Sequence, residues 1–190
     1  MNRDIGNPTA PQRVQIMLSA RASGLEARGG NVSPKPKIVP PTGGWGSLLE
    51  LATREVFEIM LGTPLEPMAD PETQRVTDMT AMIGLAGKLC GVLSICCSSA
   101  TATRIAARML GIESEEVTDS VRDALGEMCN MAAGNFKAKI NGMADACMLS
   151  IPTVVSGRDY QIHSLAAGER FEVAVTLEGL PIWVVLDLHS

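Results

Sequence analysis

The chain has 190 residues, of which 46% are hydrophobic but only 3% aromatic, so one domain is expected, with a core of aliphatic, Met and Ala side chains. A net charge of -5 at pH 7 argues against nucleic acid or an anionic membrane as the main partner. The chain lacks the roughly 20-residue apolar run of a membrane span and the apolar segment of a secretory signal. Its five cysteines lack the spacing of a disulfide framework. These features predict a cytoplasmic protein with reduced thiols.

Residues 1–43 are predicted to form a flexible tail or linker outside the folded core. They contain six of the chain's 11 prolines, which break long elements. Within them, residues 12–28 have the apolar spacing of a short amphipathic helix, but such a segment cannot fold alone. It would serve as a linker or as a docking peptide.

The folded domain is predicted to span residues 44–190. A first helix with apolar residues at helical spacing is followed by a hairpin of apolar strands, a second helix and the longest helix of the chain. Three strands come last, and a tight turn at Glu178-Gly179 joins the final two. In chain order, the predicted elements are the helix Ser47–Gly62, the hairpin Thr73–Ser98, the helices Ala100–Leu110 and Thr118–Met143, and the strands Cys147–Val155, Arg170–Leu177 and Pro181–Leu188. This order predicts an α+β domain whose helices pack on an antiparallel sheet.

The helix Thr118–Met143 has an apolar side and a polar side. Thr118 and Asp119 can cap its start, and Gly142 offers a left-handed stop at its end. The predicted core side consists of Val121, Leu125, Cys129, Ala132, Phe136 and Ile140, and the opposite side of Asp123, Glu127, Asn130, Gly134 and Asn141. Because Glu127 and Asn130 are three residues apart, they are neighbours on an exposed ridge, where Gly134 leaves room for a partner.

Two other patterns are weaker. Gly84, Gly87 and Lys88 lack both the glycine spacing of a phosphate-binding P-loop and the hydroxyl residue that follows its lysine. The only histidines, His163 and His189, occur without a CxxC or HxxxH pattern, which argues against a zinc site.

The pattern Asp123-x-x-x-Glu127-x-x-Asn130, with Pro152 after 21 further residues, resembles the signature of the CheC/CheX/FliY chemotaxis phosphatases. The resemblance covers nearly all of the predicted domain, and the similar flanking segments are Ala52–Gly62, Leu85–Ile95, Gly134–Ile140 and Leu149–Gly157. CheC-like proteins carry two such motifs, whereas this chain has no Asn between Asn31 and Asn130, so it resembles CheX. The Asn-to-Pro spacing is one residue shorter than in FliY-type members.

This resemblance implies a phosphatase for the aspartyl phosphate of a response-regulator receiver, phospho-CheY or a related protein. Asn130 would hold the attacking water through its amide, and Glu127 would pair with a lysine of the receiver. Asp123 and Gly134 would lie in the contact with this partner. No cofactor of its own is implied, because the receiver brings the Mg²⁺. The resemblance also implies a homodimer joined through sheet edges such as the strand Ile182–Leu188.

Other readings of the same residues remain open. Glu127 and Asn130 could be ordinary surface residues, since short motifs occur by chance. Asp123 and Glu127 could act as an acid–base pair, although exposed acids on a helix are more often simply solvated. A different class of function is a non-catalytic receiver-binding or flagellar-switch-like module of the same fold, related to FliM and FliN. The segment Gln15–Ala27 is weakly similar to the FliM peptide that binds phospho-CheY.

Overall fold

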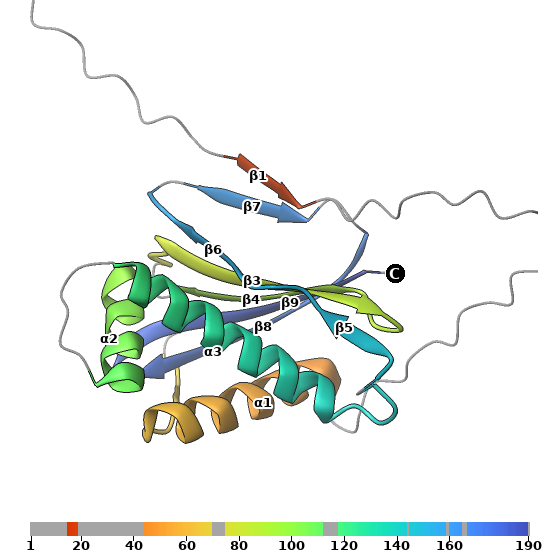
Figure 1. Cartoon of the computed structure of the whole chain (residues 1–190), viewed down its shortest axis with the longest axis horizontal. Coiled ribbons are helices and arrows are strands. Elements are labelled where there is room, and N and C mark those ends of the chain that lie inside the picture. The colour runs from red at the N-terminus through yellow and green to blue at the C-terminus, as the bar shows by residue number, and fades with distance from the viewer. Residues whose placement is uncertain are drawn as a thin grey trace, which may run out of the picture.

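The computed structural model describes residues 15–18, 44–69, 75–111, 118–143, 145–158, 160–164 and 167–189. Within these ranges, three helices pack against one face of a seven-stranded antiparallel sheet, which confirms the predicted fold class (Figure 1). The helices are α1 (Gly44–Leu61), α2 (Ser99–Leu110) and α3 (Asp119–Ala138). The strands of this sheet are β2 (Glu66–Pro67), β3 (Met79–Gly87), β4 (Gly91–Cys97), β5 (Cys147–Leu149), β6 (Thr153–Ser156), β8 (Gly168–Leu177) and β9 (Leu180–His189).

The centre of the sheet is built from the two predicted hairpins. Its strand order is β2-β8-β9-β4-β3-β5, and β6 also pairs with β3. Alternate residues of β9 face opposite sides: Ile182 and Val184 lie in the core under the helices, whereas Val185 lines a cavity on the other face. Because β9 is paired with β8 on one side and β4 on the other, the expectation that Ile182–Leu188 offers a free edge is wrong.

The predicted helix stops are confirmed for α1 and α2. Gly62 and Gly111 follow the two helices with φ of 64° and 66°, in the left-handed region that suits glycine. The Gly111 N–H donates to the Ala107 carbonyl at 2.9 Å. At the start of α2, the Ser98 hydroxyl accepts from the Thr101 N–H at 3.1 Å, which satisfies one of the free donors of the first turn.

The longest helix ends earlier than predicted. It begins at Asp119, and Thr118 occupies the N-cap position without a side-chain cap hydrogen bond. After Ala138 the chain tightens, because the Ile140 N–H donates to Lys137 O at 3.1 Å, a bond over three residues. Gly142 does have a left-handed φ of 70°, but it lies in the turn beyond the helix. Residues 139–143 therefore leave the helical axis.

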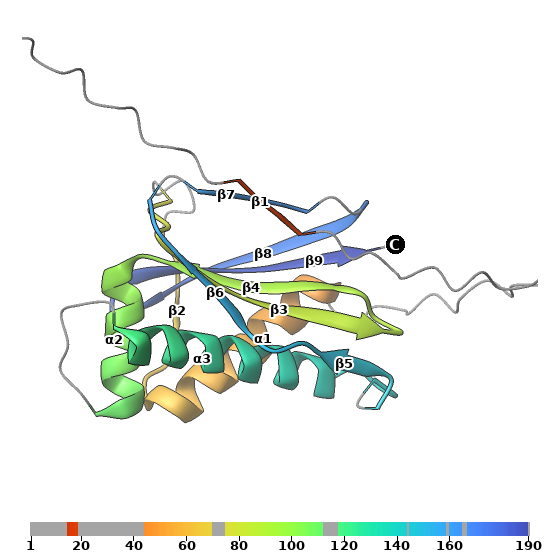
Figure 2. The same cartoon turned by 45° about the horizontal axis from the view of Figure 1, so that its top comes forward.

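The predicted strand Cys147–Val155 is interrupted. Leu149 of β5 pairs with Leu85 of β3, while Thr153 of β6 pairs with Met82, so three residues of one strand oppose two of the other. The extra residue makes residues 150–152 a β-bulge, which bends the strand beside α3. Figure 2 shows β5 and β6 running along one side of this helix.

A second, two-stranded sheet lies over the face without helices, where β1 (Gln15–Leu18) pairs in parallel with β7 (Gln161–Ser164) (Figure 1). The short helix expected over residues 12–28 is therefore wrong at Gln15–Leu18, where the chain is extended. The rest of residues 1–43 lies outside the described residues, and their assignment as a tail stays a prediction. β7 was not predicted, because its four residues carry too little apolar alternation.

All five cysteines are free thiols, and four of them are buried. Burial raises the pKa values of Cys97 and Cys129, so these thiols stay neutral. Among the helices that the structure describes, none has the length and apolar character to cross a membrane.

Candidate functional site

The polar side of α3 faces outward as predicted. Every residue assigned to its core side is buried, including Phe136 and Leu125, which are fully enclosed. On the opposite side, Asp123 and Glu127 are exposed, and Asn130 and Gly134 are half-buried. We call these four residues the α3 ridge.

Glu127 and Asn130 are available for contacts with another molecule. Within the described ranges, neither side chain has a hydrogen-bond or ion-pair partner. Asn135, five residues further along α3, is different: its Nδ2 donates to Ala52 O at 3.0 Å and to Glu55 Oε2 at 2.9 Å. The helix therefore uses Asn135 for its own packing and leaves the amide of Asn130 unused.

Gly134 leaves open space on the ridge. A Cβ built at this position would meet no atom within 4 Å, apart from the helix's own backbone. Its φ lies outside the left-handed region, so no backbone conformation requires glycine here. The fold of this chain therefore does not require glycine at this position, and the predicted role of Gly134 in the contact with a partner stays a prediction.

One border of the ridge is a seam between α3 and the bulged strand. A Cβ built on Gly126 would lie 3.4 Å from Pro152 Cβ, so the proline packs directly on this glycine. Further along, Lys137 Nζ donates to Cys147 O at 2.7 Å. In the sequence, Pro152 stands out only as part of the family signature. The signal that could have revealed its position is Gly126 itself, a small residue on a buried side of α3 directly before Glu127.

The other border is α1, which holds the C-terminal half of α3. Glu55 of α1 accepts from Asn135 and from Lys139 Nζ, the latter at 2.6 Å. The hydrogen bond from Asn135, followed by that from Lys139, lowers the pKa of Glu55 below its ordinary value of 4.5. Trp45 of α1 packs against Phe136 with ring centroids 6.0 Å apart. The ridge thus sits on a helix held from both sides.

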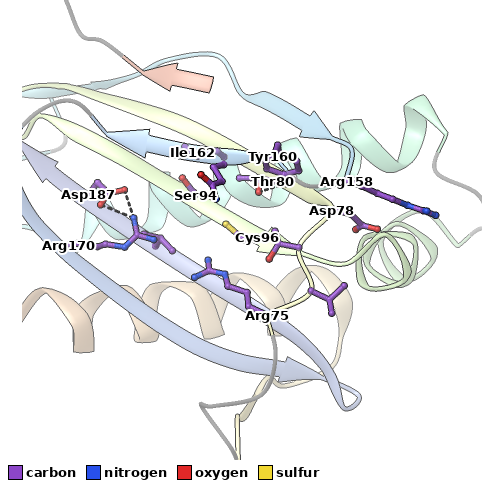
Figure 3. Close-up of a pocket in the computed structure, with 14 residues that line it drawn as sticks. Arg75, Asp78, Thr80, Ser94, Cys96, Arg158, Tyr160, Ile162, Arg170 and Asp187 are labelled. Carbon is purple, nitrogen blue, oxygen red and sulfur yellow. Dashed lines mark hydrogen bonds and ion pairs between the residues drawn. The ribbon is translucent and has the colours of Figure 1, made fainter. Parts of the chain in front are cut away.

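A cavity of about 650 Å³ lies elsewhere, on the sheet face opposite the helices (Figure 3). Two of its arginines already have carboxylate partners: Arg75 bonds to Glu172 at 2.9 Å, and Arg170 to Asp187 at 3.2 Å. Its wall includes Tyr160, whose pKa is raised by burial to about 12. No residue of the α3 ridge lines this cavity.

The geometry of the ridge suits contact with a macromolecule. An exposed helix face encloses no small ligand, whereas ligand pockets bury most of their ligand. In the described part of the chain, no group of three or more His, Cys, Asp or Glu side chains could hold a metal ion. What the ridge offers is one carboxylate and one neutral amide that can both donate and accept a hydrogen bond.

The family comparison covers the helix that carries the ridge. The model of the family described as chemotaxis phosphatase CheX matches residues 79–176, which include all of α3. The protein named CheY-P phosphatase CheX from Thermotoga maritima is 32% identical over 101 residues. That match covers 53% of this chain and 65% of the relative, so the chain spans just under two thirds of the curated relative's length.

Two solved structures share the fold. The chemotaxis protein CheX from Vibrio vulnificus matches with a TM-score of 0.67 and 21% identity, over 76% of this chain and 96% of that chain. The CheX-CheY-BeF3-Mg²⁺ complex from Borrelia burgdorferi matches with a TM-score of 0.63 and 22% identity, over 76% of this chain and 97% of that chain. At these identities the likeness establishes the fold.

Proposed function

The chain belongs to the chemotaxis phosphatase CheX family, and from this premise we propose that it dephosphorylates the aspartyl phosphate of a response-regulator receiver, phospho-CheY or a related protein. The observation that carries the proposal is that Glu127 and Asn130 are neighbours on an exposed helix ridge, where neither side chain has a partner among the described residues. The name of the Thermotoga maritima relative and the composition of the Borrelia burgdorferi complex support a CheY-like substrate.

Asn130 positions the attacking water. The water oxygen forms a bond to phosphorus while the bond between phosphorus and the receiver's aspartate oxygen breaks, which releases phosphate and restores the carboxylate. Phosphoryl transfer of this kind needs positioning and charge stabilisation more than covalent help. An amide suits the task, because its oxygen accepts from the water while its NH₂ donates, and so it can hold the water in line with the leaving oxygen.

The rest of the ridge serves the approach of the receiver. Glu127 pairs with a lysine of the receiver and sets the position of α3 in its active site. Asp123 lies one turn earlier and adds negative charge to the contact, while Gly134 lets the partner's surface come close to the helix. The Mg²⁺ belongs to the receiver, where it neutralises the phosphoryl oxygens, and this chain contributes no ligand to it.

Substitution of Asn130 tests the proposal. Asn130→Ala should lower the rate of phosphate release from a phosphorylated receiver about 10²-fold or more, while binding to the receiver persists. Glu127→Ala should weaken binding as well as rate, and the loss should be larger at low salt, where the charge contact is least screened. Asn141→Ala is the matched control, because this exposed amide lies beyond the end of α3. An Asn130→Ala protein that hydrolyses as fast as wild type would leave a non-catalytic binding module as the better reading.

We further propose that the protein is a homodimer in the cytoplasm. The free thiols suit a reducing compartment. Since β9 is not an edge strand, we propose that the second copy packs on the sheet face without helices, where Val76 is 59% exposed, an arrangement that leaves both α3 ridges outward. This arrangement lets each copy engage a receiver independently.

A further inference from the structure

The β-bulge beside the ridge places one apolar side chain in solvent. Ile151 is 85% exposed, more than any other large hydrophobic residue that the structure describes. Leu149 before it packs against the core, and Pro152 after it packs on Gly126. In a regular strand the alternation of side chains would turn an apolar residue toward the core, and the extra residue of the bulge removes Ile151 from that alternation.

The backbone around Ile151 is held in place. The Ser150 N–H donates to Gly84 O at 2.9 Å, and the Ser150 hydroxyl accepts from the Gly84 N–H at 2.9 Å. The same hydroxyl donates to Ile151 O at 2.8 Å. With Pro152 fixed against α3, both neighbours of Ile151 are anchored. An isoleucine presented in this way loses little backbone freedom when another surface covers it, which favours binding.

Helix geometry puts this bulge next to Asn130. Gly126 and Asn130 are four residues apart, so they lie about 40° from each other around α3, one turn along the same side. Pro152 contacts Gly126, and the bulge therefore borders the turn that carries Asn130. Glu127 lies on the far side of Asn130 from this seam. A partner whose phosphorylated site reaches Asn130 therefore approaches the bulge as well.

We propose that Ile151 is a second docking contact for the receiver, an apolar anchor on the opposite side of Asn130 from the charged contact at Glu127. The proposal rests on the proposed function, because the occupant is the same phosphorylated receiver. Its surface beside the phosphorylated aspartate must then offer an apolar patch to Ile151. Desolvated apolar contacts of this kind hold a complex together, whereas exposed charge pairs mainly speed and orient its formation. Ile151 thus sets affinity and Asn130 sets the rate of the bound complex.

The chain offers a matched control in Met148. This residue is 70% exposed on β5, between Cys147 and Leu149, which both contact the core. By strand alternation its side chain points to the opposite sheet face, away from α3. Met148→Asp therefore places the same charge on the same edge of the molecule without touching the ridge.

The experiment measures binding and hydrolysis separately. Binding is followed with a CheY-type receiver on which BeF3, with Mg²⁺, stands in for the phosphoryl group. Hydrolysis is followed with the phosphorylated receiver at increasing concentration. Ile151→Asp should raise Kd about tenfold or more and raise KM in parallel, while kcat at saturation stays within about threefold of wild type. Ile151→Leu should bind like wild type, and Met148→Asp should do so too. Thermal melts of each variant establish that it is folded.

Different outcomes overturn different claims. If Ile151→Asp and Ile151→Ser both bind the BeF3-treated receiver as tightly as wild type, the docking contact is wrong while the phosphatase assignment stands. If Ile151→Asp lowers kcat as strongly as Asn130→Ala without changing Kd, Ile151 acts in the reaction and not in docking. If Met148→Asp weakens binding equally, the effect comes from charge and the anchor is wrong. A wild-type protein that neither binds nor hydrolyses any phosphorylated receiver overturns the proposed function together with the contact.

Discussion

Two asparagines on α3 show how position decides what a side chain does. Asn135 bonds to Ala52 O and Glu55 and thereby ties two helices together. Asn130 has the same amide but faces outward, without a partner in the described part of the chain. A buried or half-buried amide that makes hydrogen bonds stabilises the fold, whereas an unpartnered one is free to bind a ligand or a water. The role proposed for Asn130 thus rests on its amide having no partner among the described residues.

Two substitutions of Gly134 separate access of the receiver to the ridge from the stability of the fold. Gly134→Ala should raise the free energy of unfolding by up to about 1 kcal/mol, because alanine is the better helix former and its Cβ would stand in open space. Gly134→Tyr should also fold but should raise the KM for the phosphorylated receiver, because its side chain would stand on the ridge. Chemical denaturation and phosphate release measure the two effects.

Gly126 is the control for the Gly134 substitutions, because it has close neighbours where Gly134 has none. A methyl group there would press on Pro152 and Val154, so Gly126→Ala should gain less stability than Gly134→Ala or lose some. A Gly134→Ala protein that is clearly less stable than wild type would show that the glycine is structural, against the assignment made above.

At the scale of elements, the ridge depends on α3 being fixed along its length. The seam with β5 and β6 lies on one side, and the contacts with α1 through Glu55 lie toward its end. Side-chain pairs also connect the turn between β8 and β9 to α2. Glu178 in that turn pairs with Arg104, at 2.6 Å from its Nε, and with Arg108. These side-chain pairs link elements that are distant in sequence.

The Glu178 pairs predict a pH-dependent contribution to stability. Hydrogen bonds from Arg108 and Arg104 lower the pKa of Glu178 below its ordinary value of 4.5. A depressed pKa means that the pairs stabilise the fold above about pH 4.5, and that this contribution is lost as the pH falls through the folded-state pKa. Glu178→Gln should therefore lower the melting temperature near neutral pH, and its difference from wild type should shrink in acid.

Melting curves between about pH 7 and pH 3 measure this difference. Glu178 has a left-handed φ of 51°, and Gln has the same size and the same unbranched Cβ at this position, so the comparison isolates the charge. A difference that stays constant across this range would show that the Arg pairs contribute no titrating stability.

At the scale of the whole molecule, the sheet divides two kinds of surface. The three helices, with the ridge on α3, occupy one face, and β1 and β7 lie over the other, as the ribbons in Figures 1 and 2 show. The cavity lies on this second face (Figure 3). A second copy of the chain that binds to the face without helices can therefore leave the ridge exposed.

Assembly can be measured directly. Light scattering should give a mass of about twice the 20.1 kDa of one chain at micromolar concentrations. Charge introduced at Val76, which is 59% exposed and lines the cavity face, should shift the protein toward the monomer while a monomer still hydrolyses the receiver. A wild-type mass near that of one chain would contradict the homodimer.

Deletion of residues 1–43 tests the predicted domain boundary. The four residues of β1 pair only with β7 and take no part in the seven-stranded sheet. The shortened protein should unfold with a free energy within about 1 kcal/mol of the full chain and should keep its phosphatase activity. Calorimetry and phosphate release check both, and a large drop in melting temperature would show that the segment belongs to the core.

The sequence by itself determined the elements with strong periodicity and the polar side of α3 that carries the proposed site. The apolar spacing of α1 and α3, the hairpin strands β3 and β4, and the glycine stops at Gly62 and Gly111 are local properties, because helix and strand periods and left-handed turns act over a few residues. The pair of Glu127 and Asn130 on the polar side of one helix follows from the same period.

Only the tertiary structure decided how these elements meet. Which strands of a sheet lie at its edge depends on pairing between distant segments, and so β9 is central although its sequence resembles any apolar strand. The bulge at residues 150–152 arises from the register of β5 and β6 against β3, a pairing between segments distant in sequence that no local pattern records. For the same reason the packing of Pro152 on Gly126, and with it the exposed position of Ile151 beside Asn130, became visible only in three dimensions.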